Sequence, residues 1–102
     1  METLIIVARD SMLTDLEALL HENGGAAYTI LSNVRGKGIT GRGHETFLSP
    51  GINTIIFTVL QPDQVDRAVS ALKALQAGRN KAARKDQPVP LKVFWFPCEE
   101  HV

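Results

Sequence analysis

The chain alternates short apolar runs with longer stretches whose apolar residues recur at helical spacing. Residues 3–8 form a β-branched run without charge, which is the pattern of a buried strand. Residues 12–20 follow with apolar side chains three or four positions apart, and this spacing predicts an amphipathic helix. Asp10 and Ser11 are the expected N-cap residues, and Gly24 with Gly25 is expected to end the helix.

The second half of the chain repeats this alternation. Residues 27–35 and 53–60 are predicted strands, and in the first of them one face is expected to carry Tyr28, Ile30, Ser32 and Val34. Pro62 suits a first helical position, and the helix that it opens is expected to end at Gly78. Residues 79–90 are polar, basic and end in proline, which predicts a loop, and residues 91–96 form the last strand.

The predicted order is βαββαβ, the split βαβ or ferredoxin-like pattern of the α+β class. We expect one domain over residues 1–102, with an antiparallel four-stranded sheet and two helices on one of its faces. Residues 53–60 are apolar on both alternating sets, whereas a solvated sheet face would be polar at every second position. We therefore expect the second face to be buried against other subunits; short buried strands within a monomer are the alternative.

The composition of the chain argues against nucleic acid and membranes as partners. Eleven basic residues balance eleven acidic ones, so no overall field favours nucleic acid or an anionic membrane. The strand at 53–60 also lacks the basic and aromatic residues of an RNA-binding sheet. No apolar run approaches the ~18 residues of a membrane span, and no basic leader opens the chain. With a single cysteine, Cys98, these features predict a cytoplasmic protein without disulfides.

Glycines and cations gather between the second and third predicted strands. Gly36, Lys37 and Gly38 follow Arg35, and further glycines with Arg42 and His44 come shortly after. Successive glycine amides can form a concave anion site, to which the cations add charge. The spacing resembles a dinucleotide fingerprint, but more glycines and Pro50 follow where that motif needs a helix. A plain hairpin loop is the alternative, although so long a loop is more typical of a functional segment.

A second basic cluster precedes the last strand and includes Arg84 and Lys85, with Lys92 inside the strand. Alone it would indicate a solvated surface, but beside the glycine segment it suits nucleotide phosphates. His44 with Glu45 is the one plausible metal-ligand or acid–base pair, and Cys98 is expected to be inert. No catalytic triad or pair of carboxylates stands out, so we do not expect an enzyme.

Three segments together resemble the PII signal-transduction family. The strand ending Val34-Arg35-Gly36-Lys37-Gly38 is similar to the family's Gly-x-Gly strand end, Arg42-Gly43-His44-Glu45 to an element of its long T-loop, and Asp63-Gln64-Val65-Asp66 to the start of its second helix. Residues 92–100, which begin inside the last predicted strand, are also similar to the corresponding part of the family. The resemblance implies a homotrimer with inward-facing sheets. It further implies an adenine-nucleotide site in each cleft between subunits, lined by Gly36, Lys37, Gly38 and Lys92.

The chain also departs from the family pattern. Ile39-Thr40 replaces an Arg-Gln pair that in the family helps to hold Mg-ATP and 2-oxoglutarate, and the T-loop is shorter and has no tyrosine. The resemblance therefore implies a divergent PII-like regulator, of the kind linked to bicarbonate or other transport. It would bind AMP, ADP, ATP or cyclic AMP, with a small anion such as bicarbonate, and engage a partner such as a membrane transporter through its loop.

Two other functions remain open from the sequence. A metal-binding trimer resembling the CutA proteins would need His44, Glu45, His101 or Cys98 to converge across subunits. A small ferredoxin-like enzyme would need a buried pocket with a polar catalytic group.

Overall fold

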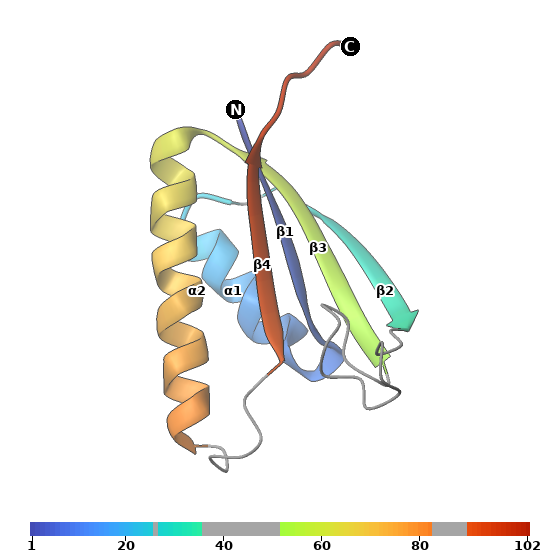
Figure 1. Ribbon diagram of the computed structural model, residues 1–102, viewed down its shortest axis with the longest axis vertical. Coiled ribbons are helices and arrows are strands. Elements are labelled where there is room, and N and C mark those ends of the chain that lie inside the picture. Colours follow the sequence, from blue (N-terminus) through green and yellow to red (C-terminus); the bar gives the residue numbers. More distant parts are fainter. Residues whose placement is uncertain (26, 36–51, 83–89) are drawn as a thin grey trace.

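The computed structural model describes residues 1–25, 27–35, 52–82 and 90–102. Within these residues the order of elements is βαββαβ, as predicted (Figure 1). The elements are β1 (Glu2–Arg9), a 3-10 turn (Asp10–Met12), α1 (Leu13–Glu22), β2 (Thr29–Arg35), β3 (Ile52–Leu60), α2 (Pro62–Ala82) and β4 (Leu91–Pro97).

The described strands form one antiparallel sheet in the order β2-β3-β1-β4. β1 lies between β3 and β4, so that Ile6 stands opposite Ile56 on one side and Val93 on the other. β2 and β4 are the two edges of the sheet. The uncharged run at 3–8 thus takes an interior position, where no polar backbone edge is exposed.

Both helices cover the same face of the sheet (Figure 1). Leu16 and Leu20 of α1 and Val65 of α2 are fully buried there against Leu4 and Ile6 of β1. These residues follow the helical spacing and the strand alternation that the sequence displays, and burying each side chain contributes about 1.5–3 kcal/mol. The predicted α+β ferredoxin-like class is therefore confirmed.

The two ends of α1 differ in how well they were predicted. Asp10 and Ser11 do not cap the helix with their side chains, because they form a 3-10 turn that leads directly into Leu13. The other end is as expected. Gly24 has a φ of 85°, and the Gly25 amide donates to the Leu20 carbonyl at 2.7 Å, which closes the last turn.

α2 continues beyond the glycine at which the sequence predicted its end. Gly78 lies inside the helix, and the loop predicted for residues 79–90 is wrong for residues 79–82. A helical glycine costs only about 1 kcal/mol relative to alanine. Arg79 also forms an ion pair with Asp15 of α1, which ties the last turns of α2 to the body. α2 therefore continues past a glycine at which local propensity alone predicts its end, and the Arg79–Asp15 ion pair lies in the part that continues.

A bulge interrupts β2. Leu31 stands opposite Ile55, but Val34 stands opposite Asn53, so β2 contains one more residue than β3 over this stretch. Within it, Asn33 has a φ of 59°. Beyond the bulge the alternation of side chains between the two faces of the sheet is reversed. Val34 therefore lies on the same face as Asn53 and Ile55, whereas the sequence predicted that it would share a face with Ile30.

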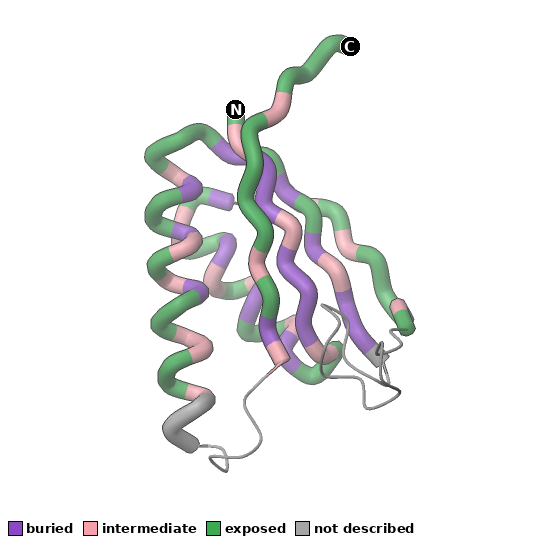
Figure 2. The backbone as a smooth tube through the Cα atoms, in the orientation of Figure 1, coloured by how far each residue is buried: buried purple, intermediate pink, exposed green. Residues whose placement is uncertain are grey.

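The face of the sheet away from the helices, which we call the open face, carries exposed apolar side chains. The registers place Phe57, Val59, Phe94, Phe96 and Leu31 on it, and each is 40–51% exposed. Figure 2 shows exposed positions along β3 and β4 among the buried positions of the sheet. The apolar pattern on both sides of the strands therefore leaves these five apolar side chains exposed on the face away from the helices.

Candidate functional site

Several connections meet at one end of the sheet, which we call the loop end (Figure 1). β1 and β2 finish there, and β3 and β4 begin there. Segment 36–51 joins β2 to β3, and segment 83–89 joins α2 to β4, so both depart from and return to this end. The glycine-rich segment and the second basic cluster are thus attached to the same end of the molecule, as predicted.

Most of the predicted ligand-binding residues lie outside the described residues. These are Gly36, Lys37 and Gly38 in the first segment and Arg84 and Lys85 in the second. The segment that resembles a shortened T-loop, with His44 and Glu45, also lies outside them. Lys92 is described: it is the second residue of β4, is exposed, and stands opposite Val7 on the open face. Its ammonium group is therefore carried by a paired strand close to the loop end.

Two arginines accompany Lys92 at the loop end. Arg9 is the last residue of β1 and stands opposite Asn53, and Arg35 is the last residue of β2 and stands opposite Ile52. Three of the four described strands thus bring a cation to this end, partly offset by Asp10. Such a set attracts anions such as phosphate or carboxylate. Arg9 was not among the predicted site residues, although a cation directly after an uncharged strand could have indicated it.

Side-chain hydrogen bonds fix the β2–β3 pair from which segment 36–51 departs. Asn53 is buried, and its Nδ2 donates to the Val34 carbonyl at 3.3 Å. The Thr54 hydroxyl donates to the Leu31 carbonyl at 3.4 Å. These two bonds lie on either side of the bulge, where regular ladder pairing is lost. The base of the glycine-rich segment is therefore held in a defined position.

Arg79, a few residues before the second basic cluster in sequence, takes part in a contact between helices. Its guanidinium pairs with Asp15 on α1, and both side chains are about half exposed. A pair of this kind contributes about 0–1 kcal/mol to stability. Arg79 is thus a helix–helix contact, and its charge is already matched by a carboxylate.

The described residues contain no group of three His, Cys, Asp or Glu side chains that could hold a metal ion. Cys98 is partly buried, and its amide donates to the Met1 carbonyl at 3.1 Å. His101 Nε2 lies 3.1 Å from a Glu99 oxygen, on an exposed segment. Within the same part of the chain, no helix is long and apolar enough to cross a membrane.

Comparisons with known proteins agree with these observations. The family model described as nitrogen regulatory protein P-II matches residues 1–100. No curated protein matches the chain in sequence.

Solved structures of CPII, a nitrogen regulatory PII-like protein from Thiomonas intermedia K12, have a similar fold. The form bound to ADP, AMP and bicarbonate is 21% identical over 93% of this chain and 82% of that chain, with a TM-score of 0.66. The form bound to ADP, AMP and acetate is 18% identical over 92% and 81%, with a TM-score of 0.68. The apo form is 18% identical over 93% and 85%, with a TM-score of 0.67.

Proposed function

Because the chain belongs to the nitrogen regulatory protein P-II family, we propose that it is a regulatory protein, not an enzyme, that binds an adenine nucleotide. The nucleotide would bind in the clefts between the subunits of a homotrimer, each subunit being a single domain. The match to the family model over residues 1–100 is the observation that carries this proposal. The cations at the loop end support it, because they suit the phosphates of such a ligand.

The directions of the edge strands favour clefts between subunits. β2 runs toward the loop end and β4 runs away from it, and they lie on opposite edges of the sheet. In a ring of three copies with their strands aligned, β2 of one copy would lie antiparallel to β4 of the next. Segment 36–51 of one copy would then meet segment 83–89 and Lys92 of its neighbour. The backbone amides at Gly36 and Gly38 would bind phosphate, together with Lys37, Lys92, Arg84 and Lys85.

The open face supports the trimeric part of the proposal. Its exposed aromatic and aliphatic side chains would be buried when three sheets face inward. The same arrangement would bring the three loop ends to one end of the assembly. A ligand that orders segment 36–51 there could change the surface that a partner meets, such as a membrane transporter. The protein would then act in the cytoplasm, as its composition suggests.

The neighbouring structures indicate which ligands to test. CPII is described as bound to ADP and AMP, with bicarbonate or acetate. We propose AMP or ADP as the nucleotide, and bicarbonate as the small anion, for this chain as well. ATP and cyclic AMP are the competing adenine nucleotides.

Isothermal titration calorimetry with AMP, ADP, ATP and cyclic AMP, each with and without bicarbonate, tests the proposal. Saturable heat with at least one nucleotide is expected. Lys37→Ala and Lys92→Ala should each weaken binding about tenfold, because each removes a charge-assisted contact to phosphate.

Arg67→Gln serves as the control for these variants. The Arg67 guanidinium lies beside Gly24, at the opposite end of the molecule from the loop end. Its loss should leave the affinity unchanged. If none of the four nucleotides produces heat, the proposed nucleotide binding is wrong; equal losses in all three variants would contradict the site.

A further inference from the structure

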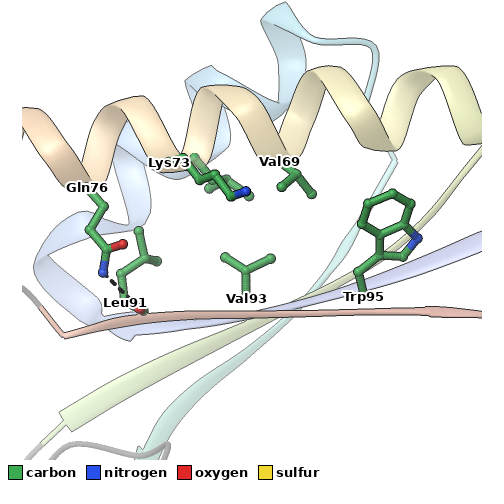
Figure 3. Close-up of a pocket in the computed structure, with 7 residues that line it drawn as sticks. Val69, Lys73, Gln76, Leu91, Val93 and Trp95 are labelled. Atoms are coloured by element: carbon green, nitrogen blue, oxygen red, sulfur yellow. Dashed lines mark hydrogen bonds between the residues drawn. The ribbon is translucent and has the colours of Figure 1, made fainter.

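A groove lies between α2 and β4 on the helix side of the sheet (Figure 3). Its volume is about 280 Å³, and its lining consists of Val69, Leu72, Lys73, Gln76, Leu91, Val93 and Trp95. At ~30 Å³ for each water molecule, this volume equals about nine water molecules, which suits a small ligand.

Two hydrogen bonds hold the ends of the groove. At one end, Gln76 Nε2 donates to the Leu91 carbonyl at 3.1 Å and links α2 to β4. At the other end, Trp95 Nε1 donates to a Glu2 carboxylate oxygen at 3.0 Å. This hydrogen bond fixes the position of the indole, and Trp95 is still 48% exposed, so much of its surface remains uncovered. The polar groups at both ends are therefore already engaged.

Lys73 is the cation of this groove. Its side chain extends from α2 between Gln76 and Trp95, above Val93 (Figure 3). It forms no ion pair with another residue in the described part of the chain. None of the lining residues is acidic, and the Glu2 carboxylate at the far end is bound to Trp95. A ligand would thus meet an apolar channel with one ammonium group part of the way along it.

We propose that this groove binds a small aliphatic carboxylate. The hydrocarbon chain would lie against Val69, Val93 and the Trp95 indole, and the carboxylate would pair with the Lys73 ammonium. The charge of Lys73 selects an acid over an amine, and the apolar lining selects a hydrocarbon chain over a free inorganic anion. This site is separate from the proposed nucleotide site, because Lys92 stands on the opposite face of β4.

Trp95 provides a direct measurement, since it is the chain's single tryptophan. Sodium octanoate should shift its fluorescence to shorter wavelength in a saturable way, because the chain covers the exposed indole. 1-Octanol should bind about three- to fivefold more weakly, the factor expected for losing a partly exposed ion pair, and octylamine more weakly still.

Lys73→Gln separates this site from nonspecific apolar binding. The Lys73→Gln variant should bind octanoate no more tightly than 1-octanol. Arg67→Gln removes another α2 cation outside the groove and should still bind octanoate more tightly than 1-octanol. Circular dichroism confirms that both variants are folded. The proposal is overturned if octanoate gives no saturable shift, or if Lys73→Gln retains the preference. It is also overturned if acrylamide fails to quench Trp95 in the ligand-free protein, since a second copy would then cover the groove.

Discussion

Tyr28 lies just before β2, where its ring packs against the core formed by both helices and the sheet. Burial raises the pKa of its phenol above the ordinary value of 10, and the Glu17 carboxylate on α1 raises it further through charge and a hydrogen bond. The folded state therefore favours the protonated phenol, which donates to Glu17. Above the transition, two negative charges would stand together at the α1–β2 contact.

This raised pKa predicts a loss of stability at alkaline pH. Because the folded pKa lies above the unfolded value of 10, the stabilisation is fully present below pH 10 and is lost as the pH rises through the folded pKa. Tyr28→Phe should remove this component. Urea unfolding of the parent protein and of Tyr28→Phe between pH 8 and pH 11 measures this pH-dependent part of the free energy of unfolding. The difference in stability between the two proteins should shrink as the pH rises. A difference that stays constant across the range would contradict the raised pKa of Tyr28.

Single residues also show what the sequence could not predict about the loop end. Lys92 could be placed on the last strand because an apolar run surrounds it. The position of Arg9 beside Asn53 depends on how β1 pairs with β3, and pairing joins residues more than forty positions apart. A single sequence contains no direct signal for such a contact. The strand-end cations therefore become a set only when the sheet register is known.

At the scale of elements, local patterns predicted which segments are helices and strands, and tertiary contacts modified where they end. α2 passes through Gly78 as the Arg79–Asp15 ion pair anchors its last turns. The bulge in β2 depends on side chains of the neighbouring strand, Asn53 and Thr54, which bond to β2 carbonyls. Neither feature follows from propensity within the segment itself, because each involves a partner element.

Gly78→Ala should stabilise the protein by about 0.5–1 kcal/mol. Gly78 is helical and exposed, and a Cβ at this position would meet no heavy atom within 4 Å beyond the neighbouring backbone of its own helix, so alanine gains helix propensity without a clash. Chemical denaturation monitored by circular dichroism measures the change. Gly24→Ala is the matched control and should destabilise, because Gly24 has a φ of 85° and its added Cβ would lie 3.3 Å from Gln64 Nε2. Destabilisation by both variants would contradict the continuous helix.

For the whole molecule, the open face is the feature that the sequence predicted best. Alternation in a strand has a period of two residues, so apolar side chains on both sets mean two apolar faces wherever the pairing is regular. The structure buries most of one set under the helices; of the other set, Phe57 and Phe94 are exposed, whereas Val7 is buried. What remains a prediction is the partner, because an apolar face alone does not specify how many copies cover it.

Phe57→Glu should break the proposed trimer while leaving the subunit folded. Phe57 stands on the open face opposite Ile5 and is 40% exposed, so a carboxylate there is solvated in the monomer but would be buried between subunits. Sedimentation equilibrium should give about three times the 11.2 kDa chain mass for the parent protein and the single chain mass for the variant. Ser70→Glu, at an exposed position of α2, should remain trimeric. An unchanged mass for Phe57→Glu would rule out assembly through this face.

The bulge in β2 reverses the phase of the chain just before it leaves the sheet. Without the extra residue, Arg35 would stand on the same side as Phe57; with it, Arg35 stands opposite Ile52, on the side of the helices. The last residue of β2 therefore faces the opposite side of the sheet from the one that unbroken alternation would give. Removing one residue between Leu31 and Val34 would restore the alternation and move this last residue to the face that carries Phe57. The number of residues in β2 thus decides on which face of the sheet the strand presents its terminal charge.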